Sequence, residues 1–275
     1  MRRKIAILGS GNVATFLAKA LRKANNTITQ VYSPNFENAT SLANKINADP
    51  IDNISHLRDG ADLDVYIIAV SDDAIGEVAA QLKTEHKIVL HTSGATSKEI
   101  LHEVSENYGV LYPYQSLRKG DLIDINNLCM FFDGSNEETL SMAEELAFEV
   151  AGYAIQVNDE ERLQYHLAAV FANNFSNHLF ALAEKMLQDR GLDFENLKPI
   201  ILQTAQNAMA QSPAKNQTGP AIRGDEKTMS KHLELLRNEE NLNKIYTDLS
   251  LSIKNFIPHE VAETEEETEE AEPEA

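Results

Sequence analysis

The sequence is poor in cysteine, in positive charge and in long apolar runs. Its single cysteine, Cys129, excludes an internal disulfide and fits a reducing compartment, so we expect a cytoplasmic protein. The 275 residues include 24 Lys and Arg against 43 Asp and Glu, and the formal charge of −19 argues against nucleic acid and anionic membranes as partners. No apolar stretch approaches the roughly 20 residues of a membrane-spanning helix. The apolar run after Lys4 is too short for a signal peptide.

Much of the negative charge lies at the end of the chain. The segment 258–275 contains nine glutamates and no lysine or arginine. A segment of this composition has too little apolar surface to offset the entropy of ordering it. We therefore expect residues 258–275 to form a disordered acidic tail.

The segment 4–14 predicts a dinucleotide site. A short apolar run, typical of a buried strand, is followed at once by the spacing Gly9-x-Gly11-x-x-Ala14 and by a helical pattern. The first glycine permits a sharp turn, the second lets a pyrophosphate approach the backbone, and the alanine lets the helix lie close to the strand. Phosphates are then favoured at the helix N-terminus. A purely structural glycine turn is the alternative. The expected cofactor contacts here are Gly9, Ser10, Gly11, Asn12 and Val13.

The first half of the chain alternates apolar runs with helical patterns. This alternation is typical of a doubly wound, mainly parallel sheet, and we expect an α/β Rossmann domain over 1–157. We expect Ser71 to cap one of its helices and Thr96 to open another with Glu99 as a capping box. After the first strand, the predicted strands are 27–32, 64–70, 87–91, 109–112, 128–133 and 153–157. The predicted helices that follow the opening one are 36–47, 71–82, 96–106 and 137–151.

The periodicity changes near residue 158. Residues 159–190 contain no glycine or proline, and helical spacing persists until Gly191. A helix of about thirty residues is long for a globular protein, and we expect it to be largely buried. Further helical patterns cover 194–211, 226–238 and 241–256. The second domain, 158–257, is therefore predicted to be all-helical.

Six motifs occur together along the chain. They are GSGNVA at 9–14, AVSD at 69–72, HTSG at 91–94, YPYQS at 112–116, the helical segment 166–174 and TGPAIRGD at 218–225. Together they resemble a family of Rossmann-like proteins with a helical C-terminal domain of unknown function. That family is similar to pyrroline-5-carboxylate reductases and to the 6-phosphogluconate and β-hydroxyacid dehydrogenases. The resemblance covers nearly everything from Lys4 to Ile257. It implies a 6-phosphogluconate-dehydrogenase-like helical domain and a homodimer formed through it.

The end of the second predicted strand indicates which nicotinamide cofactor binds. An acidic residue there bonds the ribose hydroxyls of NAD, whereas nearby cationic or donor groups accommodate the extra phosphate of NADP. Ser33 and Asn35 can both donate hydrogen bonds, and the first carboxylate is Glu37. The sequence therefore favours NADP, with NAD as the alternative because the arginine usual in relatives is missing. A plain strand-end turn is the structural interpretation of the same residues.

Polar residues also follow two central strands at the edge where ligands bind in open α/β sheets. Val70 and Ser71 would lie under the ribose and nicotinamide, and Ser93 would present a hydroxyl. His91 ends the second of these strands and titrates near neutrality unless it is perturbed. The alternative for His91 is a strand-end histidine bonded to the backbone.

The long helix carries the predicted catalytic face. His166, Asn173 and Asn177 share one side of it, with Asn174 and His178 beside them. Asparagine is a poor helix former, so this cluster predicts either a polar cleft or hydrogen bonds between helices or subunits. Gln115 and Ser116 are further candidates for the cleft. β-Hydroxyacid dehydrogenases place a catalytic lysine on this helix, but the sequence has no lysine between 159 and 177.

We therefore predict an NADP-dependent oxidoreductase that passes hydride between the nicotinamide and a small anionic carbonyl or imine compound. His166 would donate the proton, and Asn173 or Asn174 would orient the carbonyl. Arg223 would bind the anionic group of the substrate, unless it forms a local ion pair with Asp225. No spacing predicts a metal site. The alternative function is a nucleotide-binding sensor or structural protein without catalysis, which the missing lysine favours.

Overall fold

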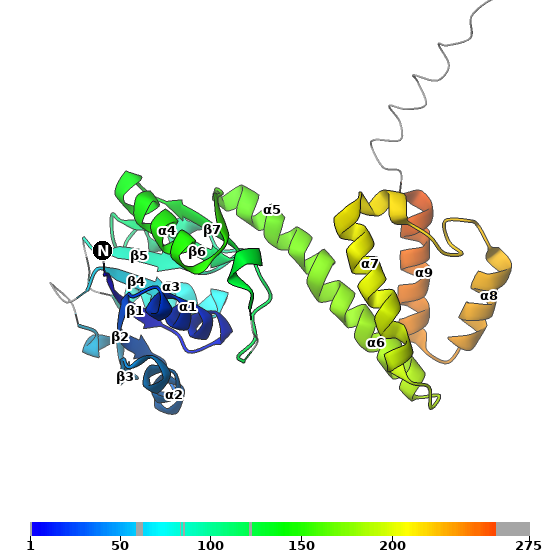
Figure 1. Ribbon diagram of the computed structural model, residues 1–275, viewed down its shortest axis with the longest axis horizontal. Helices are drawn as coiled ribbons and strands as arrows, with labels where there is room; N and C mark the ends of the chain where they lie inside the picture. Colours follow the sequence, from blue (N-terminus) through cyan, green and yellow to red (C-terminus); the bar gives the residue numbers. More distant parts are fainter. Residues whose placement is uncertain (1, 59–62, 83, 85, 121–122, 257–275) are drawn as a thin grey trace, which may run out of the picture. The chain divides into compact units, whose positions relative to one another are not determined.

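The computed structural model describes residues 2–58, 63–82, 84, 86–120 and 123–256, so the predicted acidic tail lies outside the described residues. Within this part of the chain, eight strands form one sheet in the order β3-β2-β1-β4-β5-β6-β7-β8 (Figure 1). Neighbouring strands run parallel except β6 and β7, which confirms a mainly parallel, doubly wound sheet. The strands are β1 (Lys4–Leu8), β2 (Thr27–Tyr32), β3 (Asp49–Ile51), β4 (Val65–Ile68), β5 (Ile88–His91), β6 (Tyr108–Pro113), β7 (Cys129–Gly134) and β8 (Tyr153–Gln156).

Both faces of the sheet are covered, which explains why its strands are continuous apolar runs. Alternate side chains of β1 enter two separate cores: Ile5 and Ile7 belong to one, and Ala6 and Leu8 belong to the other. The helices on the first face are α1 (Asn12–Lys23), α2 (Phe36–Ile46) and α4 (Glu137–Val150). The second face is covered by α3 (Ile75–Ala80) and by short 3₁₀ turns.

Two predicted helix starts were wrong in detail. The Ser71 side chain makes no capping hydrogen bond, although the chain does turn helical at Asp72. The predicted helix at 96–106 is only the 3₁₀ turn η4 (Lys98–Leu101), and Ser97 rather than Thr96 caps it. Thr96 is used otherwise, because its hydroxyl accepts a hydrogen bond from the Ser93 hydroxyl at 3.0 Å.

The predicted long helix is not one uniform α-helix. It consists of α5 (Asp159–Ala169), a π-helical segment η6 (Val170–Phe175) and α6 (Ser176–Gln188). It begins with a capping box in which Asn158 and Glu161 satisfy each other's backbone N–H groups. In the single chain it is not largely buried, contrary to expectation: Leu167 is 51% exposed and Phe171 62% exposed.

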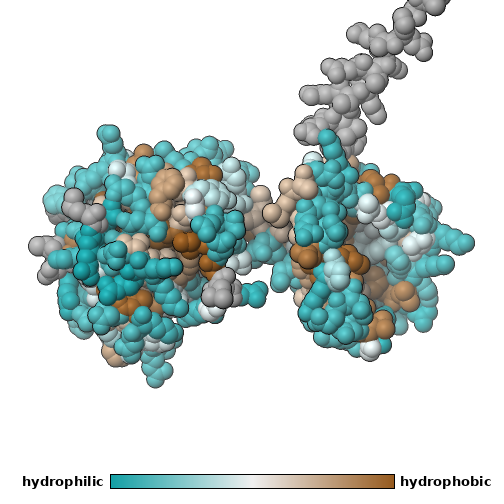
Figure 2. Space-filling view, in the orientation of Figure 1, coloured by the Kyte–Doolittle hydropathy of each residue, from teal (hydrophilic) through white to brown (hydrophobic). Residues whose placement is uncertain are grey.

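The chain divides into two compact units, Met1–Ala181 and Leu182–Ala275. The sheet ends at Gln156, near the predicted boundary, but α5 belongs to the first unit because its side chains bond to the strand edge, as described below. The second unit contains the rest of α6 together with α7 (Lys198–Ala210), α8 (Glu226–Leu235) and α9 (Glu240–Asn255). No helix among the described residues is long and apolar enough to cross a membrane. Figure 2 shows apolar side chains at the surface of the second unit. Met209, which belongs to this unit, is 88% exposed.

Candidate functional site

The turn between β1 and α1 contains two glycines, and the packing around them differs. Gly9 has a φ of +132°, and a Cβ atom there would lie 2.1 Å from the backbone oxygen of Ala69. The fold itself therefore requires this glycine. Gly11 has an ordinary φ of −73°, and a Cβ atom would meet nothing within 4 Å. Neither conformation nor packing within the described residues explains Gly11, whereas the close approach of a ligand to the backbone would.

The end of β2 places two hydroxyl groups together. The Ser10 hydroxyl donates to the Ser33 hydroxyl at 3.0 Å, and Ser33 is only 4% exposed. Asn35 caps α2, because its side-chain oxygen accepts from the backbone N–H of Asn38 at 3.0 Å. This capping agrees with the purely structural interpretation of the turn at the end of β2. It leaves the Asn35 amide donors, but not its oxygen, available for a ligand.

The strand edge at β4 and β5 differs in detail from the prediction. Ser71 is exposed and Val70 is partly buried. Ser93, however, is buried, and its hydroxyl accepts from the backbone N–H groups of Ala95 and Thr96 at 3.1 and 2.9 Å. Since it also donates to Thr96, this hydroxyl is fully used within its own turn. The backbone N–H of Ser93 donates to His91 and its backbone oxygen accepts from Arg162, so contact between Ser93 and a cofactor stays a prediction.

His91 is a neutral structural residue. It is fully buried, and its Nδ1 accepts from the backbone N–H of Ser93 at 3.1 Å, which puts the proton of the neutral ring on Nε2. Burial and the nearby Arg162 guanidinium lower the pKa of His91 from 6.5 to about 4. The alternative of a strand-end histidine bonded to the backbone therefore fits, and His91 has no accessible role in proton transfer.

Arg162 links α5 to this turn and was missed by sequence reasoning, because an arginine on a helix usually indicates a solvated face. It is only 1% exposed. Its Nε donates to the backbone oxygen of Ser93 at 3.1 Å, and Nη2 donates to that of Thr96 at 2.5 Å. Nη2 also pairs with Asp159 at 2.7 Å. Burial would raise the pKa of Asp159, but hydrogen bonds from Ser97 and Arg162 lower it overall. The first turn of α5 is thus anchored to the sheet edge.

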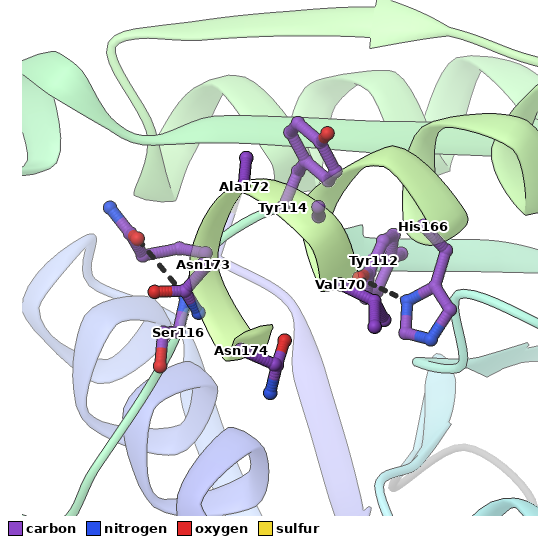
Figure 3. A pocket seen from close by; sticks show the side chains of 10 residues that line it. Tyr112, Tyr114, Ser116, His166, Val170, Ala172, Asn173 and Asn174 are labelled. Atoms are coloured by element: carbon purple, nitrogen blue, oxygen red, sulfur yellow. Dashed lines mark hydrogen bonds between the residues drawn. The ribbon is translucent and has the colours of Figure 1, made fainter. Parts of the chain in front are cut away.

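One turn beyond Arg162, a hollow of about 390 Å³ opens between the end of β6 and the π segment (Figure 3). The structure brings together here three of the predicted catalytic residues and both candidates from the YPYQS motif. The lining residues are Tyr112, Tyr114, Gln115, Ser116, His166, Ala169, Val170, Ala172, Asn173 and Asn174. None of these carries a formal charge at neutral pH when His166 is neutral, so the lining offers polar groups without a fixed cation.

His166 is held against the strand edge. The hydroxyl of Tyr112 lies 3.1 Å from His166 Nδ1, as the dashed line in Figure 3 shows. Burial raises the pKa of Tyr112 to about 12, so the phenol stays protonated and can donate to Nδ1. With the phenol as donor, Nε2 is the ring nitrogen that carries the proton of a neutral His166. A Cβ atom on Gly94 would lie 2.6 Å from His166 Nδ1, so glycine is what allows this histidine to approach the turn after β5.

The asparagines that reach the hollow are those within the π segment. Asn173 and Asn174 lie within it and line the hollow, as expected. Asn177 and His178 do not line it, contrary to the face predicted from α-helical spacing. A π turn contains about one residue more than an α turn, so it rotates every later side chain relative to that spacing. Segments of this kind occur often at functional sites.

Arg223 lies in the second unit and is exposed. It makes no ion pair within 4 Å among the described residues, so the alternative of a direct pair with Asp225 is not formed. Asp225 instead caps α8 through the backbone N–H and the hydroxyl of Thr228 at 3.0 and 2.7 Å. The hydrogen bonds from Thr228 lower the pKa of Asp225, and the nearby charge of Arg223 contributes to lowering it. Binding of a substrate by Arg223 stays a prediction. Among the described residues, no group of three His, Cys, Asp or Glu is placed to hold a metal.

Comparison with known proteins identifies the family. Residues 4–94 match the family described as NADP oxidoreductase, coenzyme F420-dependent, and residues 128–253 match a domain of unknown function, DUF2520. The chain is 32% identical to a proposed NADP oxidoreductase of Bacteroides fragilis, over 93% of this chain and 99% of the other, with a TM-score of 0.87. The chain belongs to this NAD(P)-dependent oxidoreductase family. None of the curated proteins matches the sequence.

More distant structures share the fold of this oxidoreductase family. A protein of Thermotoga maritima is 23% identical over 95% of this chain and 99% of its own, with a TM-score of 0.69. A 1-pyrroline-5-carboxylate reductase of Streptococcus pyogenes is 14% identical over 93% and 99%, with a TM-score of 0.57. The resemblance inferred from the six motifs, including the similarity to pyrroline-5-carboxylate reductases, is confirmed.

Proposed function

We propose that this oxidoreductase transfers hydride between NADP and a small anionic carbonyl or imine compound. The observation that carries the proposal is the contact of His166 with Gly94 and Tyr112 at the edge of β5 and β6. A dinucleotide whose phosphates lie at the β1–α1 turn extends its nicotinamide along this edge. A proton donor therefore stands beside the place where a reacting carbonyl or imine would lie.

In this proposal His166 donates a proton from Nε2 to the carbonyl oxygen or imine nitrogen as hydride arrives from the nicotinamide. Tyr112 keeps the ring oriented and in the required tautomer. Asn173 or Asn174 donates an amide hydrogen to the substrate and fixes its position. The bound cofactor supplies the hydride. Arg223 is the proposed partner of the anionic group, because no side chain that lines the hollow is a lysine or arginine.

The preference for NADP rests on the end of β2 and on the family. The residues at the end of β2, Ser33 and Asn35, carry no negative charge that would repel a 2′-phosphate. The amide donors of Asn35 are available to bind it. Titration with NADPH and with NADH, followed by fluorescence, tests this choice. We expect a lower dissociation constant for NADPH. A lower value for NADH would contradict it.

A nucleotide-binding protein without catalysis is the second candidate, favoured by the absence of lysine between 159 and 177. Stopped-flow measurement of NADPH oxidation with a panel of ketoacids and cyclic imines separates the two. Turnover of at least one anionic compound supports the oxidoreductase. Binding of the cofactor without turnover across a broad panel would support the sensor or structural protein instead.

We also propose a cytoplasmic homodimer formed through the helical domain. Apolar side chains on α5 and η6 stand well exposed in the single chain, and so do several in the second unit, including Met209. A second copy would bury such surface, and monomeric proteins rarely expose large apolar patches. Light scattering at micromolar concentration is expected to give twice the 30.6 kDa of one chain. The mass of a single chain would contradict the proposal.

A further inference from the structure

A groove with a positively charged lining runs along α1 in the first unit. It has a volume of about 210 Å³ and is lined on one side by α1 residues from Asn12 to Lys23 and on the other by the loop that follows β6. We call it the cationic groove. Its basic residues are Lys19 and Lys23 on the helix and Arg118 and Lys119 on the loop.

These four cations lie in a strongly acidic chain. None of them forms an ion pair with a described residue, although the sequence has 43 carboxylates for 24 lysines and arginines. Four like charges along one groove repel one another, and the repulsion falls when an anion binds between them. The groove is therefore suited to a negatively charged ligand.

The loop end of the groove is fixed beside the glycine turn. The backbone N–H of Lys119 donates to the side-chain oxygen of Asn12 at 3.2 Å. Asn12 is the first residue of α1 and directly follows Gly11. A Cβ atom added to Gly11 would meet only open space. The hydrogen bond thus holds the loop that carries Arg118 and Lys119 at the N-terminus of α1.

We propose that Arg118 and Lys119 neutralise the pyrophosphate of the bound dinucleotide. This inference rests on the proposed function, because it requires a dinucleotide at the β1–α1 turn. Arginine can bond two phosphate oxygens at once, and lysine adds a mobile positive charge. Both cofactors contain the pyrophosphate, so the two residues raise the affinity for NADPH and for NADH alike and leave the choice between them to the end of β2.

The other end of the groove offers a matched control. Lys23 follows Asn12 by eleven positions, and at 1.5 Å per residue their Cα atoms lie about 16 Å apart along α1. Lys23 has the same charge and lines the same groove, but it is too far from the turn to touch a phosphate there. Its charge would act on the cofactor only at long range, where salt screens it.

Titration of the full chain with NADPH and with NADH at several salt concentrations tests the inference. The variants are Arg118→Ala, Lys119→Ala, their combination and Lys23→Ala; Arg118 and Lys119 are exposed, so folding is not at stake. Each of the two loop substitutions is expected to weaken both cofactors by about tenfold, with an unchanged ratio between them. The double variant should also show a weaker dependence on salt. Lys23→Ala should change either affinity by less than about twofold.

Three outcomes would overturn the inference alone: unchanged affinities in the loop variants, an equal loss in Lys23→Ala, or a loss restricted to NADPH. The last result would assign the cations to the 2′-phosphate. A wild-type chain that binds neither cofactor would overturn the proposed function, and with it this inference.

Discussion

The two sides of the candidate site are held in different ways. The glycine turn is mostly local: the three consecutive residues 9–11 connect β1 to α1, and one distant residue, Ala69 directly after β4, lies with its backbone against Gly9. The hollow is assembled over long range, since Tyr112 and His166 lie 54 positions apart and meet through one hydrogen bond. Local geometry should therefore determine whether cofactor binds, and the long-range contacts should determine whether chemistry follows.

The largest effect is expected on the local side. Gly9→Ala places a Cβ atom 2.1 Å from the backbone oxygen of Ala69 at a φ of +132°. The free energy of unfolding should fall by about 3 kcal/mol or more, measured by urea denaturation. Gly120→Ala is the control, because its φ is +100° but its Cβ atom meets nothing within 4 Å. It should cost about 1 kcal/mol. Equal losses in the two variants would show that the contact with Ala69 is unimportant.

On the long-range side, His166→Gln removes the proposed proton donor. Single-turnover hydride transfer should slow by about 100-fold or more, whereas the dissociation constant of the cofactor should stay the same. His102→Gln is the control, since His102 is an exposed histidine outside the hollow. An unchanged rate in His166→Gln would remove His166 from the mechanism.

The pH dependence of stability tests the role of the buried His91, which lies directly before the turn after β5. Its pKa is about 4 in the folded chain against 6.5 ordinarily, so the unfolded chain binds more protons between these values. The free energy of unfolding should therefore fall as the pH is lowered from 6.5 to 4, by about 3 kcal/mol from this residue. His91→Asn keeps an acceptor for the Ser93 N–H and should lose this part of the pH dependence. Equal slopes in thermal or urea unfolding of both proteins would contradict the assignment.

The smallest effect is expected for Tyr112→Phe, which keeps the ring and removes the hydroxyl that faces His166. The tautomer of His166 is then no longer fixed, and hydride transfer should slow by about tenfold with a shifted pH profile. Tyr108→Phe is the matched control, since its hydroxyl bonds Glu99 away from the hollow. A pH profile that is the same as that of the wild type would show that Tyr112 has only a packing role.

The glycine turn and the sheet were predictable because short-range rules determine them. A strand covered on both faces is an apolar run, and β2 (Thr27–Tyr32) has the predicted bounds. The grouping of His166, Asn173 and Asn174 also followed from helical spacing and from the low helix propensity of asparagine. The short strand β3 has three residues and no such pattern, so it was not predicted.

The rest of the site depends on contacts that spacing does not reveal. Arg162 is buried because two backbone oxygens and Asp159 surround its guanidinium, and nothing in the neighbouring sequence distinguishes it from a solvated arginine. The π segment interrupts the α-helical spacing at 170–175, and Asn177, which follows it, does not line the hollow. The link between Lys119 and Asn12 joins residues 107 positions apart, so only the folded chain shows it.

The central claim is that the turn at Gly11 holds a dinucleotide, and Gly11→Ala tests it most directly. The substitution fits the φ of −73° and meets no atom within 4 Å. Alanine is a poorer N-cap than glycine but makes the unfolded chain less flexible, and these opposing effects should keep the change in the free energy of unfolding below about 1 kcal/mol. A methyl group would nevertheless occupy the space assigned to the phosphates. Titration with NADPH should show binding to the wild type and at least about tenfold weaker binding to an equally stable variant. Equal affinity in the two proteins would contradict the account.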